Sequence, residues 1–168
     1  TPDSIKNTVN YYATQYMLNM AITMLNTRLA ELIQTAEPPF TSASAGYGNF
    51  FLAKTKEAFT LNGSSKLDGI ELAMKTVLQE AERARRFGFT ATEYERARAN
   101  YLQAIETAYN ERDKRKSGGF VDEYVNSFLD NEPIPGLEAE CAIIKQLAPQ
   151  ITVEYINQIM GQLLTDNN

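Results

Sequence analysis

The hydrophobic positions in the first fifth of the chain repeat with the period of a helix. Apolar side chains recur every three or four residues through residues 2–35, as Ile5, Val9, Tyr12, Tyr16, Met20, Leu25, Leu29 and Leu32. Thr1 and Pro2 suit the cap and the first position of a helix, and the pair Pro38-Pro39 follows its end. We therefore expect one long helix over residues 2–35.

The period changes between residues 40 and 62. Residues 41–51 are small and polar, whereas residues 54–62 are richer in Thr and Phe and partly alternate. These patterns predict two strands, over about 41–51 and 54–62, that pair as an antiparallel hairpin. Gly46 and Gly48 inside the first strand indicate a bulge or a close approach of another backbone segment.

Helical periodicity returns after the hairpin. We expect a helix over about 66–86, capped by Ser64 or Ser65, whose inner face carries Ile70, Met74, Val77, Leu78 and Ala81. Gly88 would end this helix in a left-handed conformation.

The next helix is expected over about 91–116. Thr90 and Glu93 form a capping box at its start, with Phe89 and Tyr94 at the hydrophobic staple positions. Its inward residues would be Tyr94, Ala97, Tyr101, Ile105 and Ala108.

The remainder of the chain also favours helices. A break is expected at 117–119, a helix over 120–129 and a rigid turn over 131–136. A short helix over 137–147 follows. Thr152 would cap a last helix over about 153–164, with Ile156, Ile159, Met160 and Leu163 inward.

This set of elements predicts an α+β fold, in which a short antiparallel sheet packs with five or six helices. A stable sheet normally needs three or more strands, and a helix such as that over 2–35 usually follows a strand in an α/β layer. We therefore expect that at least one strand is missing and that residues 1–168 are a single domain excised from a larger chain. Residues 1–130 would form its core of helix, hairpin and helices, and residues 131–168 a C-terminal helical extension.

None of the 168 residues is a histidine. Because His is the usual general base near neutral pH and the commonest protein ligand of zinc, the chain cannot contain a Ser-His-Asp or Cys-His nucleophile or a His-based metal site. Cys141 is the only cysteine, which excludes an internal disulfide, and its apolar helical context predicts a buried thiol. We predict no catalytic, cofactor-binding or metal-ligating residue here, and expect that the chain by itself is not an enzyme.

The charge distribution excludes some classes of binding partner. The net charge is −5, and residues 120–168 carry eight acids against one base, Lys145. This acidic segment argues against nucleic acid and anionic membrane as partners, and no run approaches the ~18 apolar residues of a membrane span. Carboxylates spaced two apart, at 80 and 82, 93 and 95, and 138 and 140, point to different sides of a helix and indicate solvated faces.

Residues 78–90, followed by 93–98, resemble a segment of the pitrilysin/insulinase-type zinc peptidases. The similar segment lies in the second, non-zinc-binding domain of a half-molecule. Residues 28–32 and 58–61 resemble the same domain, and residues 132–136 with 151–152 resemble its tail in bacterial members that have a long chain of two halves. The resemblance covers most of residues 25–160.

The resemblance implies a non-catalytic structural domain, part of the wall of the chamber in which a zinc metalloendopeptidase degrades peptides. The zinc of the parent protein would be held by an inverted H-x-x-E-H motif in another domain. The expected partners are neighbouring domains of the same parent chain and, in the parent, the peptide substrate. The compartment implied is the bacterial periplasm or cell envelope.

Two other functions fit the same residues. The chain would look the same as a binding or assembly module of an inactive peptidase paralogue, and the long first helix also suits a free-standing helical interaction protein. An exposed strand edge would further allow a dimer.

Overall fold

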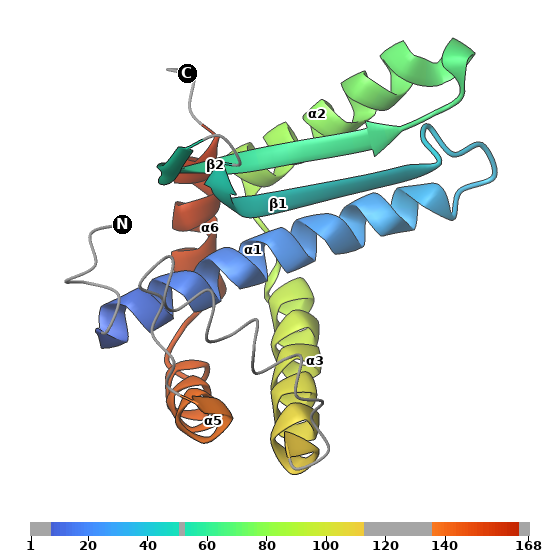
Figure 1. The fold of residues 1–168 in the computed structure, drawn as a ribbon. Coiled ribbons are helices and arrows are strands. Elements are labelled where there is room, and N and C mark those ends of the chain that lie inside the picture. Colours follow the sequence, from blue (N-terminus) through green and yellow to red (C-terminus); the bar gives the residue numbers. More distant parts are fainter. Residues whose placement is uncertain (1–7, 51–52, 113–135, 165–168) are drawn as a thin grey trace. The chain divides into compact units, whose positions relative to one another are not determined.

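The computed structural model describes residues 8–50, 53–112 and 136–164 (Figure 1). The elements in chain order are α1 (Val9–Ile33), β1 (Ser42–Phe50), β2 (Ala53–Ser64), the 3-10 helix η2 (Leu67–Gly69), α2 (Ile70–Phe87), α3 (Ala91–Asn110), α5 (Gly136–Leu147) and α6 (Val153–Leu163). The predicted α+β class, with helices dominating a two-stranded antiparallel sheet, is confirmed. The break expected at 117–119, the helix over 120–129 and nearly all of the turn over 131–136 lie outside the described residues.

The chain divides into two compact units. One contains residues 1–16 and 96–151, and the other contains residues 17–95 and 152–168. The sequence-based division into a core over 1–130 and an extension over 131–168 stays a prediction.

The first unit is helical in its described part. The rings of Tyr16 and Tyr101 meet edge to face with centroids 5.6 Å apart. Cys141 is a free, buried thiol on α5, as expected from its apolar context. The Nζ atom of Lys145 lies 3.1 Å from the Oε1 atom of Glu106, which forms an exposed ion pair.

The second unit contains the sheet. The register pairs Ser42 with Ser64 and continues regularly to Asn49 opposite Glu57, and it shifts between Asn49 and Phe50. The irregularity therefore lies beside the hairpin turn and not at Gly46 or Gly48. Only Gly46 has a close neighbour, since a Cβ there would lie 3.1 Å from the Thr60 hydroxyl, whereas the space beside Gly48 is open.

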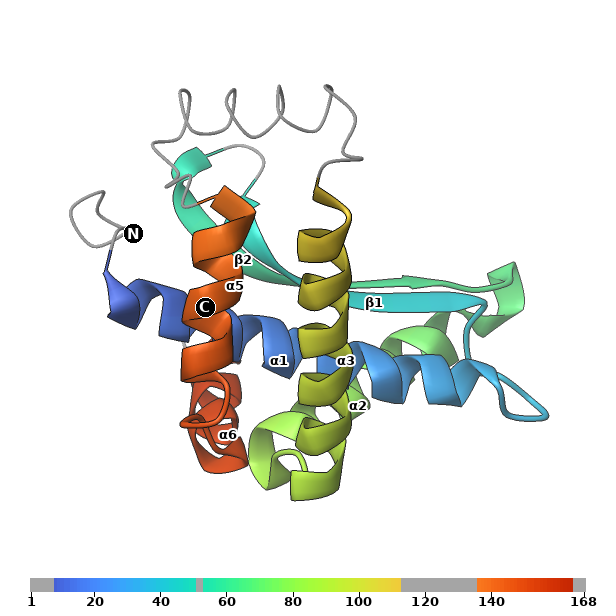
Figure 2. The same cartoon turned by 90° about the horizontal axis from the view of Figure 1, so that it is seen from below.

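The two faces of the sheet differ in polarity. Ala43, Ala45 and Tyr47 alternate along β1 on one face, opposite Gly63, Leu61 and Phe59 of β2, and Ala45 is buried. The other face carries exposed Ser42, Ser44, Thr60 and Asn62. Helices α1 and α2 lie on the same side of the sheet (Figure 2). The apolar alternation and the helical stripes thus meet in one layer interface.

The interior of the second unit is built mainly from α1. Helix α1 contributes Met20, Ala21, Met24, Leu25 and Leu29, all nearly inaccessible, and α6 contributes Ile156 and Met160. The predicted stripe of α1 is confirmed in its central part, whereas Val9 is 62% exposed. Ile5 lies outside the described residues.

The predicted inner face of α2 is only partly correct. Val77 and Ala81 are buried, but Ile70, Met74 and Leu78 are exposed, and the buried row is completed by Ala73 and Ala84. The small side chains of the buried row let α2 approach its neighbours closely. The largest apolar residues, which led to the prediction, lie on the neighbouring row and are exposed. On α3, Tyr94 and Ala97 are buried as predicted, but Ala108 is exposed.

The helix starts show which capping predictions hold. Gly69 is the N-cap of α2, so neither Ser64, which ends β2, nor Ser65 caps it. Thr152 takes the N-cap position of α6 but makes no side-chain cap hydrogen bond. Gly88 ends α2 with φ 70°, as its positive-φ prediction requires, but with ψ −164° it is extended and not left-handed helical.

Candidate functional site

Zinc is bound in proteins mainly by His, Cys, Asp and Glu side chains. The sequence contains no histidine, and its single thiol is buried in α5. Across residues 8–50, 53–112 and 136–164, no three His, Cys, Asp or Glu residues are grouped so that they could hold a metal ion. Among the same residues, no helix is both long and apolar enough to cross a membrane.

A partly buried ionic cluster, defined here as Arg28, Glu80 and Glu93, joins three helices of the second unit. The Arg28 Nε atom donates to Glu93 Oε1 at 2.6 Å, and its Nη2 atom donates to Glu93 Oε2 at 3.0 Å. The Nη1 atom lies 3.4 Å from Glu80 Oε1. The Arg28 side chain is 11% exposed, so this two-point pair is largely removed from water.

The same guanidinium also fixes the turn between α2 and α3. Its Nη2 atom donates to the Gly88 carbonyl oxygen at 2.9 Å. Its Cζ atom lies 4.7 Å from the centroid of the Phe89 ring, in cation–π range. Arg28 therefore contacts both helices and the turn that joins them.

Glu93 combines this pairing with the predicted capping box. Its Oε2 atom accepts the Thr90 backbone N–H at 2.7 Å, and the Thr90 hydroxyl accepts the Glu93 N–H at 3.3 Å. The hydrogen bond from Arg28, supported by those from Thr90 and opposed by burial, lowers the pKa of Glu93 to about 2. The same bond raises the pKa of Arg28. Both groups are therefore charged across the whole physiological range.

Asn157 of α6 also binds the turn between α2 and α3. The Asn157 Oδ1 atom accepts the Phe89 N–H at 2.7 Å, and its Nδ2 atom donates to the Phe89 carbonyl at 3.1 Å. A Cβ on Gly88 would lie 2.5 Å from the Asn157 amide, so only glycine fits there. The turn is thus held by α1 and α6 at once.

The sequence interpretation missed Arg28 as an interacting residue and treated Glu80 and Glu93 as solvated. The expectation that Glu80 and Glu82 point to different sides of α2 is nevertheless correct. Glu80 contacts Arg28, whereas Glu82 pairs with Arg85 and Arg86 of its own helix. A signal for Arg28 existed in the pattern. Arg28 follows the fully buried Met24 by four residues and Leu25 by three, so it lies on the same face of α1 as these two residues.

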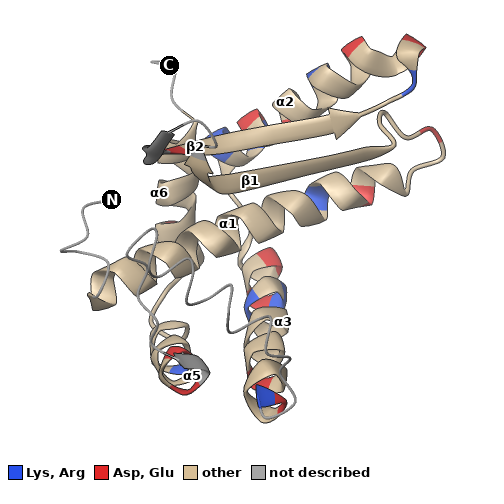
Figure 3. Ribbon diagram, viewed as in Figure 1, with Lys and Arg blue, Asp and Glu red and all other residues tan. Residues whose placement is uncertain are grey.

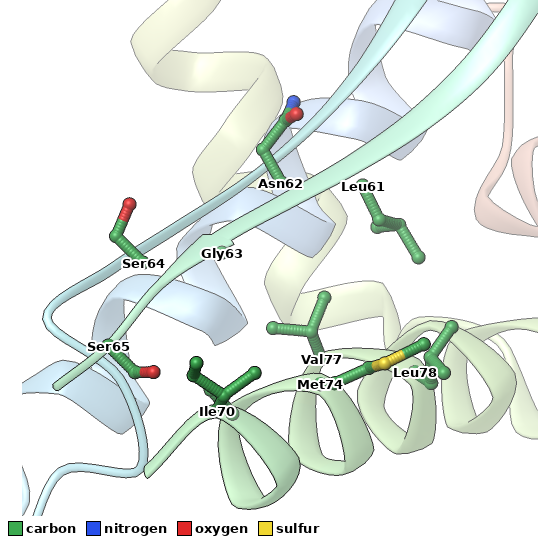
Figure 4. A pocket seen from close by; sticks show the side chains of 10 residues that line it. Leu61, Asn62, Gly63, Ser64, Ser65, Ile70, Met74, Val77 and Leu78 are labelled. Carbon is green, nitrogen blue, oxygen red and sulfur yellow. The ribbon is translucent and has the colours of Figure 1, made fainter. Parts of the chain in front are cut away.

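An apolar groove opens between β2 and α2 in the second unit. Its volume is about 590 Å³, and its lining includes Leu61 of β2 and Ile70, Met74, Val77 and Leu78 of α2 (Figure 4). In Figure 4 Leu61 lies on the side of β2 that faces α2, whereas Asn62 lies on the other. The groove can take apolar side chains of a partner.

A more polar hollow lies where β2 meets the end of α6. The Tyr47 hydroxyl donates to Glu57 Oε2 at 2.9 Å, and the lining also includes Phe59 of β2 and Gln162 of α6. Burial, with the neighbouring Glu57 carboxylate, raises the pKa of Tyr47 to about 12. Tyr47 is therefore a neutral hydrogen-bond donor at physiological pH.

The chain is similar to proteins of one kind. It is 29% identical over 164 residues to a zinc protease described as PQQL-like from Arabidopsis thaliana. The aligned region covers 98% of this chain but only 14% of that protein. The crystal structure of the first half of the periplasmic protease PqqL from Escherichia coli matches with a TM-score of 0.84 and 22% identity, over 94% of this chain and 33% of that one. The structure of PqqL itself matches with a TM-score of 0.83, over 93% of this chain and 17% of that one. No family model matches the chain.

These matches bear on the resemblance expected from residues 78–98. The chain spans about one seventh of the plant relative and a third of the solved half-molecule. The fold of the chain is that of a part of a PqqL half-molecule. The resemblance to a domain of a half-molecule in a two-half, pitrilysin-type zinc protease is thereby confirmed.

Proposed function

We propose that this chain is a non-catalytic domain of a larger zinc protease and forms part of the wall of the chamber in which that protease degrades peptides. The observation that carries the proposal is the match along 98% of this chain to one seventh of a zinc protease. A match of that size corresponds to a part of the relative and not to the whole of it. Zinc, its ligands and the hydrolytic water would belong to another domain of the longer protein.

The chemistry of the described residues supports this division. The chain lacks histidine, and each carboxylate of the cluster around Arg28 already has a cation as its partner, since Arg28 pairs with Glu93 and Glu80, and Arg83 also pairs with Glu80. Such a cluster fixes helices in place and offers no open ligand position. The groove between β2 and α2 provides the apolar surface that a neighbouring domain would cover.

The experiment compares the 168-residue chain with the longer protein that carries it. Zinc content is measured by mass spectrometry, and hydrolysis with an internally quenched peptide. We expect the isolated chain to bind no stoichiometric zinc and to cleave nothing, while the longer protein binds zinc and loses activity with a chelator. Zinc-dependent hydrolysis by the chain alone would refute the proposal.

The same experiment separates the proposed role from that of an inactive paralogue. A longer protein that contains H-x-x-E-H and hydrolyses the peptide supports the wall of an active chamber. A longer protein without this motif, which binds the peptide but does not cleave it, supports a binding or assembly module. We propose the periplasm as its location, because both solved neighbours are a periplasmic protease; fractionation of cells tests this.

A further inference from the structure

Asn62 and Gly63 of β2 form the only Asn-Gly pair among the 168 residues. In such a pair the backbone nitrogen of the glycine can attack the Cγ atom of the asparagine side chain, because no Cβ on the second residue shields that nitrogen. Whether the attack occurs depends on how firmly the structure holds the side-chain amide and the backbone between the two residues.

The side-chain amide of Asn62 is held by nothing in the described part of the chain. Asn62 is exposed, and its side chain leaves β2 on the side away from α2 (Figure 4). No hydrogen bond joins its amide to another described residue. The amides of Asn26 and Asn157, by contrast, each make two hydrogen bonds to the backbone. The Asn62 side chain can therefore turn toward the next peptide group.

The N–H of Gly63 points away from β1. Both polar groups of Ala45 are bonded to Asn26, so Ala45 and Leu61 form a non-hydrogen-bonded pair of the ladder. Because the two kinds of pair alternate, Gly63 directs its N–H outward like Leu61, whereas the C=O of Asn62 bonds inward to β1. The attacking nitrogen is thus free of the ladder, and only the Asn62 carbonyl side of this peptide group is held.

The pair lies near the open end of the hairpin, where Ser42 and Ser64 form the last pair of the ladder. The Gly63 nitrogen reaches the Asn62 Cγ atom only when the backbone between them leaves the extended conformation, so the last pairs of the hairpin must open. Thr41 opposes this opening, because its N–H and its hydroxyl donate to the Ser64 carbonyl oxygen at 2.7 and 2.9 Å. An end of this kind opens locally at less than the free energy of global unfolding.

We propose that Asn62 is a site of spontaneous deamidation in the folded chain, by way of a cyclic imide formed with Gly63. The Gly63 nitrogen loses its proton to hydroxide and forms a bond to the Asn62 Cγ atom, and the Cγ–Nδ2 bond breaks as ammonia leaves with a proton from water. Water then opens the ring. Cleavage of the bond between the nitrogen and Cγ gives aspartate, and cleavage of the bond between the nitrogen and the backbone carbonyl carbon gives isoaspartate. The net reaction consumes water and releases ammonia, with no change of oxidation state.

Either product changes the end of β2. The part of β2 from Ala58 to Ser64 contains no Lys, Arg, Asp or Glu, so the new carboxylate would be its only charge (Figure 3). Isoaspartate also inserts a CH₂ group into the main chain before Gly63, which shifts Gly63 and Ser64 against their partners on β1. Because these two residues line the groove between β2 and α2, the modification would alter that groove.

Peptide mapping by mass spectrometry tests the site. Trypsin cleaves after Lys56 and Lys66, and the peptide between them contains Asn62 as its only asparagine. After incubation of the folded 168-residue chain in neutral buffer, this peptide should show the mass of the acid in two chromatographic peaks, and faster conversion at alkaline pH. The peptides that contain Asn26 and Asn157 should stay unchanged. An intact Asn62 in the folded chain, after a time in which the urea-unfolded chain is converted, would overturn the proposal.

Two variants of the pair test the mechanism. Gly63→Ala fits the fold, because its Cβ would lie 3.6 Å from the Val77 Cγ2 atom, an ordinary contact, and its methyl group shields the attacking nitrogen. Asn62→Gln keeps the exposed amide but requires a larger ring. At an unchanged Tm, Gly63→Ala should be converted severalfold more slowly than wild type, and Asn62→Gln should not be converted in the same time. Conversion of Gly63→Ala at the wild-type rate would contradict attack by this nitrogen.

A matched pair of threonine variants tests the route through the open end of the hairpin. Thr41→Val removes the hydroxyl that binds the Ser64 carbonyl oxygen, and Thr35→Val removes an exposed hydroxyl that binds the Leu32 carbonyl oxygen at the end of α1. Only Thr41→Val should speed the conversion of Asn62, by severalfold, because it makes opening of the last pairs easier. Equal rates in the two variants would show that the reaction does not depend on this end, and would overturn the route.

Discussion

Replacing Arg28 with methionine should destabilise the chain more than any other single charge removal in the described residues. Methionine keeps most of the aliphatic stem but removes the donors to Glu93, Glu80 and the Gly88 carbonyl. Glu80 and Glu93, whose side chains are 10% and 22% exposed, would then be partly buried carboxylates without this cation. Removing one partner of a buried pair costs about 3–5 kcal/mol.

The pKa of Glu93 gives a second route to this magnitude. Lowering it from the usual 4.5 to about 2 corresponds to about 3 kcal/mol, at about 1.4 kcal/mol per pH unit. Because the folded pKa lies below the unfolded one, this stabilisation is complete above the unfolded value. It is lost as the pH falls through the window from about 5 to 2. Because the shift also contains the hydrogen bonds from Thr90 and the opposing effect of burial, it gives the direction of the Arg28 contribution and only its order of magnitude.

The assay is urea unfolding followed by circular dichroism at pH 7 and pH 3. Wild type should lose stability between these values, and Arg28→Met should be about 3 kcal/mol less stable at pH 7, with a smaller difference at pH 3. Arg83→Met is the control, because Arg83 is 63% exposed and Glu80 would still be paired with Arg28. This variant should lower the free energy of unfolding by less than about 1 kcal/mol. The reasoning is wrong if Arg28→Met has the same free energy of unfolding as the control. It is also wrong if the stability lost by Arg28→Met relative to wild type is the same at pH 7 and pH 3.

Three further predictions concern the second unit. Gly88→Ala should destabilise the chain by about 2 kcal/mol or more, because the residue has φ 70° and its Cβ would meet Asn157; the matched Gly161→Ala, in a helix with open space, should be neutral or stabilising in the same unfolding assay. Asn26→Leu should cost about 1–3 kcal/mol, because the Ala45 peptide groups lose their partner, and faster exchange of the Ala45 amide checks this. Tyr47 should ionise near pH 12, and Tyr47→Phe should remove that late component from an ultraviolet titration; unchanged titration of the variant would contradict the assignment.

Local signals in the sequence predicted local structure well. Thr90 and Glu93 are three residues apart, so the capping box depends on one helix start and needs no knowledge of the rest of the fold. The hairpin also follows from neighbouring segments, and its strands begin and end within two residues of the prediction. The irregularity in the register lies beside the turn, whereas Gly46 and Gly48, where a bulge or a close backbone approach was expected, are paired regularly.

Contacts between distant segments could not be read in the same way. Arg28 and Glu93 are 65 residues apart, and nothing in either local pattern joins them. On α2, the largest apolar residues define one row, but packing selected the adjacent row of Ala73, Val77, Ala81 and Ala84. Hydrophobic periodicity identifies an apolar face, whereas the side-chain size that its neighbours tolerate decides which row is buried.

The pKa values in this chain argue for a structural use of its ionisable groups. A general acid or base is most effective when its pKa lies near the working pH, and active sites use burial and like charges to bring it there. Here Glu93 is moved down to about 2 and Tyr47 up to about 12. Each group is stabilised in the form that it already has at pH 7, the carboxylate by Arg28 and the phenol by burial beside Glu57. Groups held in this way fix helices and strands, which is what we expect of the structural domain proposed above.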